Sequence, residues 1–63
     1  MARAKATLAA VKALPHVEDA WQEEEDSFFV RYRAGWTGAE GTDHDTAESL
    51  AELMRRARDA EKQ

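Results

Sequence analysis

The spacing of apolar residues near the N-terminus predicts a short amphipathic helix. Ala4, Leu8 and Val11 follow the i, i+4, i+7 spacing of one helical face. The surrounding residues are rich in Ala, which has the highest helix propensity. Because Pro15 disfavours helical geometry at the residue before it, we expect this helix to span residues 3–13.

Two further segments, residues 16–24 and 27–34, have the pattern of β-strands. In the second segment Phe28, Val30 and Tyr32 alternate with the side chains of the opposite face, which is the period of a strand with one buried side. The acidic link between the segments lacks the Asn-Gly signal of a tight primed turn. We therefore predict an antiparallel hairpin with a short, charged loop.

A loop of two or four residues fixes which side chains of the two strands share a face. Odd positions of the first strand then lie with even positions of the second, so Val17 and Trp21 should join the apolar face. Asp19 is the exception on that face. The opposite face should carry Glu18, Ala20, Phe29, Arg31 and Arg33.

The segment after the hairpin predicts a loop followed by a second helix. Residues 35–41 contain all three glycines, which is typical of a chain reversal. A third strand starting near Thr42 has only a poor signal, so the pattern leaves open whether residues 36–43 form one. Asp45 and Glu48 have the spacing of a capping pair. An apolar stripe follows them and predicts a helix over residues 46–61, through Ala47, Leu50, Leu53, Met54 and Ala57.

Two amphipathic helices against one face of a hairpin make a small two-layer α+β unit of α-β-β-α order. At 63 residues the chain has room for one domain, residues 1–63. Thirteen of its hydrophobic residues are Ala, so the core is too small to surround a deep pocket. We therefore expect a non-enzymatic protein without cofactors. The absence of Cys excludes disulfides and thiolate chemistry.

The charge is distributed unevenly along the chain. The formal net charge is −4, yet residues 18–52 carry eleven acidic and two basic side chains, a balance of −9, between two basic ends. The longest apolar run is four residues, Leu8 to Val11, and the longest without Ala is three, Phe28 to Val30, so we expect no membrane span. The N-terminal segment lacks the continuous apolar stretch of a secretory signal. These features predict a soluble cytoplasmic protein.

Candidate chemistry for metal binding or catalysis is thin. Asp43, His44, Asp45 and Glu48 are residue types that bind metals. The same residues are explained by Asp45 capping the helix, by carboxylates near its positive end and by a solvated His44. No spacing singles out a nucleophile and its base. We therefore predict no metal site and no catalytic residues.

One strand face offers an alternative interface. Phe29, Arg31 and Arg33 have the composition of a small stacking and phosphate platform. The net acidic charge disfavours direct nucleic-acid binding, and Glu18 is placed to neutralise one arginine across the strands. A small regulatory module that forms homodimers through its hairpin edges, or binds RNA through this face, is the alternative function.

The acidic segment is the most distinctive feature of the chain. A dense negative field captures basic surfaces rapidly, and carboxylates can take the place of nucleic-acid phosphates. We therefore predict that the partner is a larger protein with a basic, nucleic-acid-binding surface. The predicted contact residues are Glu23, Glu24, Glu25, Asp26, Asp43 and Asp45.

Parts of the sequence also resemble small proteins of phages and mobile elements. The segments that carry the resemblance are Val17-Glu18-Asp19-Ala20-Trp21 through Phe28-Phe29-Val30-Arg31-Tyr32, Gly35-Trp36, and Gly41-Thr42-Asp43-His44-Asp45-Thr46. In size and acidity the chain is similar to small anti-CRISPR proteins, some of which are DNA mimics. The basic ends depart from a uniformly acidic mimic. The resemblance implies an inhibitor acting in the host-cell cytoplasm on a CRISPR effector, and it identifies no functional residue.

Overall fold

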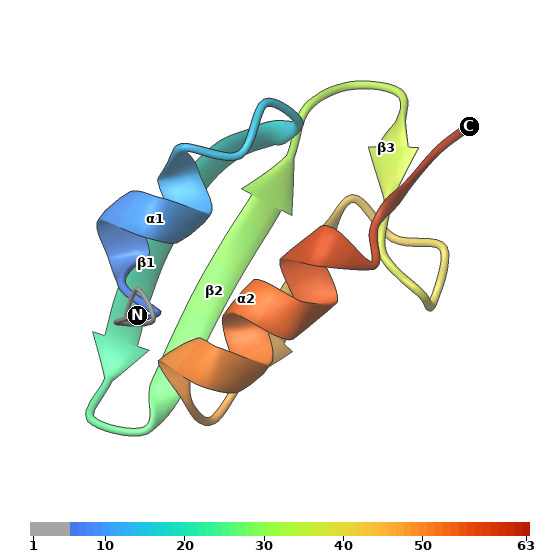
Figure 1. The fold of residues 1–63 in the computed structure, drawn as a ribbon. Coiled ribbons are helices and arrows are strands. Elements are labelled where there is room, and N and C mark those ends of the chain that lie inside the picture. The colour runs from blue at the N-terminus through green and yellow to red at the C-terminus, as the bar shows by residue number, and fades with distance from the viewer. Residues whose placement is uncertain (1–5) are drawn as a thin grey trace.

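The computed structural model describes residues 6–63 and contains two helices packed against a β-sheet (Figure 1). A three-stranded antiparallel sheet has the order β1-β2-β4, and a separate pair joins β3 to β5. The elements in chain order are α1 (Leu8–Lys12), β1 (Val17–Glu24), β2 (Ser27–Tyr32), β3 (Trp36–Thr37), β4 (His44–Ala47), α2 (Leu50–Arg58) and β5 (Glu61–Lys62).

Both helices cover the same face of the sheet, and the core lies between them (Figure 1). This confirms the predicted α+β fold, with helices packed on a hairpin. The helices and strands contribute buried apolar side chains to one cluster, and Val11, Val30 and Leu53 are fully buried in it. The full cluster is Val11, Val17, Ala20, Phe28, Val30, Tyr32, Ala47, Leu53, Met54, Ala57 and Ala60. No element of residues 6–63 packs as a second layer on the other face of the sheet.

The hairpin has the predicted strands but a different register. A β-bulge between Val17 and Asp19 adds one residue to β1, after which Trp21 pairs with Phe29. Successive side chains of a strand point to opposite faces of the sheet, so one extra residue moves every later side chain to the other face. The predicted core position is therefore right for Val17 and wrong for Trp21, which lies on the outer face. Ala20 is buried instead.

The first helix is shorter than predicted. Thr7 is the N-cap, and its hydroxyl accepts a hydrogen bond from the Ala10 N–H at 3.0 Å. The predicted boundary at residue 3 lies outside the described residues. Within them the helix begins after Thr7, because the hydroxyl satisfies an N–H that has no partner inside the helix. The helix ends before Pro15, as expected.

The second helix begins four residues later than predicted, and Asp45 does not cap it. Ser49 is the N-cap, accepting the Glu52 N–H at 3.2 Å, while a Glu52 carboxylate oxygen lies 3.4 Å from the Glu48 N–H. This is close to a capping box, whose Ser-x-x-Glu pattern is present in the sequence. Thr46 and Ala47, which the prediction places in its first turn, belong to β4 instead. The helix also ends at Arg58 rather than at the predicted residue 61, and Glu61 belongs to β5.

The third strand of the sheet is β4, and it pairs with β2 from Phe28 opposite Ala47 to Arg31 opposite His44. The glycine-rich segment before it is a loop, as predicted, apart from the two residues of β3. Gly35 and Gly41 have φ values of 91° and 81°, a region that glycine enters without a steric penalty. The pairing of β3 with β5 links this loop to the end of the chain.

In residues 6–63 there is no helix with both the length and the apolar character that a membrane crossing requires.

Candidate functional site

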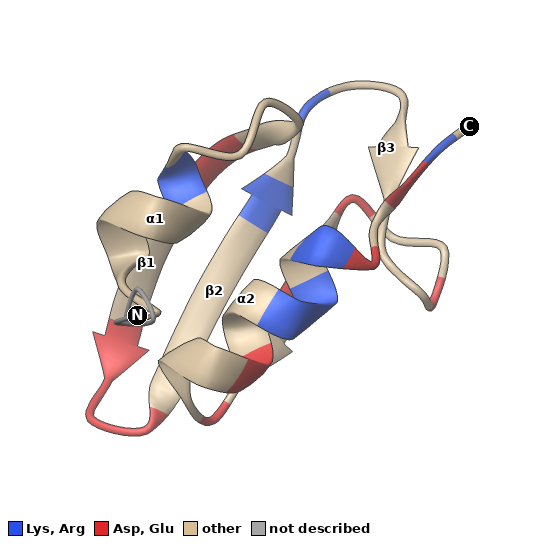
Figure 2. Cartoon of the chain, in the orientation of Figure 1, with Lys and Arg blue, Asp and Glu red and all other residues tan. Residues whose placement is uncertain are grey.

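The turn of the β1–β2 hairpin concentrates negative charge at one end of the sheet (Figure 2). Four consecutive carboxylates occupy this turn and the adjoining end of β1, and all four are exposed: Glu23, Glu24, Glu25 and Asp26. Glu48 follows β4 at the same end, because Phe28 at the start of β2 pairs with Ala47. We call these five residues the acidic end. Within residues 6–63, none of them is in an ion pair.

The backbone of this turn is held by a side chain. The Gln22 amide Nε2 donates to the carbonyl oxygens of Glu24 at 2.9 Å and Glu25 at 3.2 Å. These bonds hold carbonyl groups at the end of β1 and in the turn. A turn fixed in this way presents its carboxylates without a further loss of backbone entropy on binding.

Asp43 lies at the opposite end of the sheet from the acidic end. Its carbonyl accepts the Tyr32 N–H at the far end of β2, at 2.8 Å. Its exposed carboxylate lies 3.0 Å from His44 Nδ1, and the hydrogen bond with His44 is the main cause that lowers the pKa of Asp43. The structure therefore does not bring Asp43 together with the hairpin carboxylates.

Asp45 faces the core and belongs to a buried polar cluster. It is 6% exposed, and its Oδ2 accepts the Tyr32 hydroxyl at 2.5 Å. Arg56 Nη1 lies 3.9 Å from Oδ1, and Gly38 packs so closely that a Cβ there would overlap the carboxylate. Burial, followed by the hydrogen bond to Asp45, raises the pKa of Tyr32 far above its usual value. Asp45 therefore has a structural role here, and its buried carboxylate is not presented for contact with a partner.

The outer face of the sheet carries a row of three stacked rings, one from each strand. The Trp21 and Phe29 centroids are 5.0 Å apart, and those of Phe29 and His44 are 5.4 Å apart, with interplanar angles of 11° and 12°. We call these three residues the aromatic row. Sequence reasoning missed it because it predicted a hairpin without a bulge, in which Trp21 faces the core.

The residues of the predicted alternative interface each contact a different neighbour. Arg31 Nη2 is 2.8 Å from Glu18 Oε2, as the cross-strand argument predicts. Arg33 lies beyond β2, and its Nε donates to the Pro15 carbonyl at 3.1 Å. Phe29 has a ring on either side of it, so neither of its faces is free for a nucleotide base. This geometry is poorly suited to a base-stacking platform.

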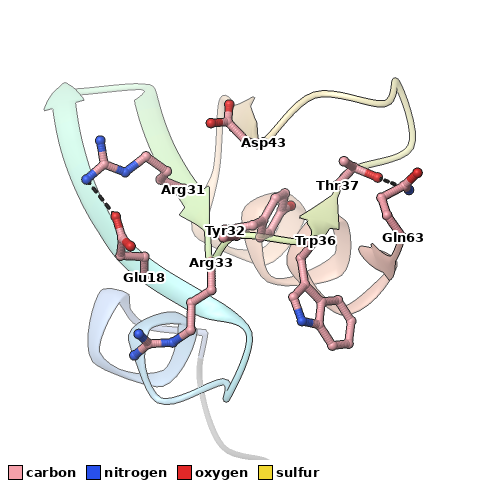
Figure 3. A pocket seen from close by; sticks show the side chains of 10 residues that line it. Glu18, Arg31, Tyr32, Arg33, Trp36, Thr37, Asp43 and Gln63 are labelled. Carbon is pink, nitrogen blue, oxygen red and sulfur yellow. Dashed lines mark hydrogen bonds and ion pairs between the residues drawn. The ribbon is translucent and has the colours of Figure 1, made fainter.

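A surface hollow of about 480 Å³ lies beside the end of β2 (Figure 3). Its lining includes Arg31, which points to Glu18, while Gln63 donates to the Thr37 hydroxyl at 2.7 Å (Figure 3). Two pairs of polar side chains in its wall thus bond one another. The two histidine rings contact the Ala57 carbonyl and the Asp43 carboxylate, and among residues 6–63 neither ring is hydrogen-bonded to a hydroxyl group.

In the described part of the chain no group of three or more His, Cys, Asp or Glu side chains is arranged to hold a metal ion. Asp45 points into the core while His44 belongs to the outer face, so the candidate metal ligands are separated. Comparison with protein-family models, curated proteins and solved structures gave no match. The residues and their geometry therefore carry the functional argument.

Proposed function

We propose that this chain is a non-enzymatic protein that inhibits a larger protein by occupying a basic, nucleic-acid-binding surface. One observation carries the proposal: the hairpin turn holds four consecutive exposed carboxylates, and Glu48 adds a fifth beside them. In its most specific form the chain is an anti-CRISPR-type inhibitor of phage origin, acting in the host cytoplasm on the DNA-binding groove of a CRISPR effector.

The position of the acidic end favours rapid association with a cationic groove. It occupies one end of a molecule whose largest extent is 33 Å, whereas the basic residues of α2 belong to the last turn of that helix, away from the acidic end (Figure 2). A concentrated field of one sign orients a molecule as it approaches a surface of opposite charge. The hairpin should therefore enter the groove first, with its carboxylates in the positions of phosphates.

The test is capture of the partner with two matched charge-reversal variants. Tagged wild-type chain, Glu24→Lys/Glu25→Lys and the control Glu40→Lys/Glu61→Lys are incubated with lysate of the source cell. The control makes the same change in net charge at exposed positions away from the acidic end. Circular dichroism verifies that all three chains are folded.

We expect the wild type and the control to retain a protein that added DNA or RNA displaces. The Glu24→Lys/Glu25→Lys chain should lose it, and retention should weaken steeply with salt. Equal capture by both variants, or a captured protein that nucleic acid does not displace, would contradict the proposal.

A further inference from the structure

The aromatic row has a fixed geometry on the open face of the sheet. Trp21 Nε1 donates to Glu23 Oε1 at 2.6 Å, and this bond holds the indole in place. Phe29 and His44 complete the stack across β2 and β4. Rigid aromatic side chains lose little conformational entropy on binding and are enriched at the centres of protein interfaces. The row therefore has the properties of a contact centre.

The border of the row carries more acidic than basic side chains. Glu18 and Asp19 lie along β1 on one side of the face, where Lys12 Nζ is 3.8 Å from Asp19 Oδ1, and Asp43 adjoins His44 on the other. The cation between them, Arg31, is already bound by Glu18 at 2.8 Å. An apolar centre with an anionic border is complementary to a protein surface that carries an apolar group flanked by Lys or Arg.

Trp21 stacks on Phe29 with one of its ring faces. Within residues 6–63 no second ring stacks on its outer face, which points away from β2 because β1 is an edge strand. A cationic side chain on that outer face would contact the indole π-system and lie beside the Glu23 carboxylate, which is fixed by the indole N–H. Two attractive contacts for one cation thus converge at the end of the row.

We propose that the aromatic row is the contact centre for a basic protein segment, with a Lys or Arg side chain of that segment on the outer face of Trp21 beside Glu23. This inference deepens the proposed function and rests on it for the basic character of the partner. It adds a short-range anchor to the long-range attraction of the acidic end.

Strand addition at the sheet edges is a poorer explanation of this face. Asp19 Oδ1 accepts the Ala20 N–H of the edge strand at 2.8 Å, and the Thr42 hydroxyl donates to the His44 carbonyl of the other edge at 2.8 Å. Backbone groups that a new strand would need are thus occupied by side chains. A second copy of the chain on the open face would also bring two negative borders together.

The test uses a phage-displayed library of random linear peptides, selected on the folded wild-type chain. We expect the recovered peptides to combine Lys or Arg with an aromatic or large aliphatic residue. In two-dimensional NMR spectra of the wild type, synthetic copies should shift the Trp21 indole N–H resonance. Their Kd should rise about tenfold or more in Trp21→Ala, as for an interface anchor, and about threefold in Glu23→Gln. Thr46→Val, an exposed change on the same face, should leave the Kd unchanged.

Several results would overturn the inference. One is recovery of peptides without basic residues, or of none. Another is binding that shifts the acidic end while the indole N–H stays in place; that result leaves the proposed function standing. Peptides could also bind at the aromatic row while Glu24→Lys/Glu25→Lys captures the partner as well as the wild type does. That result would contradict the proposed function, and the inference on the aromatic row would fall with it. If Trp21→Ala does not fold, the inference is decided by the shift of the Trp21 indole N–H resonance in the wild type and by the Kd of Glu23→Gln.

Discussion

The buried bond between Tyr32 and Asp45 provides a sharp test of what stabilises this small fold. The Asp45 carboxylate is 6% exposed, and the Tyr32 hydroxyl at 2.5 Å is its one short side-chain partner within residues 6–63. Arg56 Nη1, at 3.9 Å, is too distant for a good hydrogen bond. The substitution Tyr32→Phe keeps the ring in the core and removes this donor alone.

The expected loss is a large fraction of the total stability. A hydrogen bond to a charged group contributes about 1.5–3 kcal/mol, and the carboxylate left behind remains buried. A domain of 63 residues has a free energy of unfolding of roughly 3–9 kcal/mol. We therefore expect Tyr32→Phe to lose about 2 kcal/mol and to melt about 10 °C lower.

The measurement is urea unfolding followed by circular dichroism. Thr46→Val removes an exposed hydroxyl and should stay within about 0.5 kcal/mol of the wild type. In a double-mutant cycle, Tyr32→Phe combined with Asp45→Val should cost at least about 1 kcal/mol less than the two single changes together, since no buried carboxylate is then left without its donor. A Tyr32→Phe chain as stable as the Thr46→Val control would refute the reasoning.

Three further predictions concern the same fold. Gly38→Ala should destabilise the chain by about 1–3 kcal/mol in a thermal melt, because a Cβ there overlaps the Asp45 carboxylate; an unchanged melting temperature contradicts this. Ser49→Ala should cost about 1 kcal/mol in urea unfolding, because it removes the acceptor of the Glu52 N–H; an unchanged midpoint argues against the cap. The raised pKa of Tyr32 implies stability that is present below about pH 10 and declines above it, where the unfolded chain ionises. Ultraviolet absorbance of this sole tyrosine should show ionisation only together with unfolding, and ionisation near pH 10 in a folded chain would exclude the effect.

The sequence predicts which segments form helices and strands better than it predicts which face of the sheet each side chain occupies. Alternation identifies β2 and the apolar stripe identifies α2, because both patterns follow from burial on one side. The bulge after Val17 depends on tertiary packing, and it places the Trp21 side chain on the outer face of the sheet instead of the core face. The one hint of it is Asp19, which fits poorly on the predicted apolar face and lies opposite Arg31 in the structure.

The candidate site could be predicted only where it is local in sequence. The hairpin carboxylates are consecutive, so the turn necessarily brings them together. Asp43 and Asp45 belong to the same predicted contact surface, but the sequence places Asp45 at a helix start, and Ser49 caps that helix instead. In a sequence, a carboxylate next to the apolar stripe of a helix looks like an N-cap residue. Only the group that its oxygen contacts distinguishes an N-cap from a buried hydrogen-bond acceptor. For Asp45 that partner, Tyr32, is 13 residues away.

The central position of β2 has a consequence for aggregation. Its Phe28–Tyr32 stretch is the most apolar, β-prone segment of the chain, the type that forms intermolecular sheets when exposed. In the folded protein it is paired on both sides, by β1 and by β4. The protection is unequal, since β1 has eight residues and β4 has four. The Asp45–Tyr32 bond helps to hold β4 in place. Detachment of β4 would expose one edge of this segment. Conditions that break that bond should therefore promote fibrils before the hairpin itself opens.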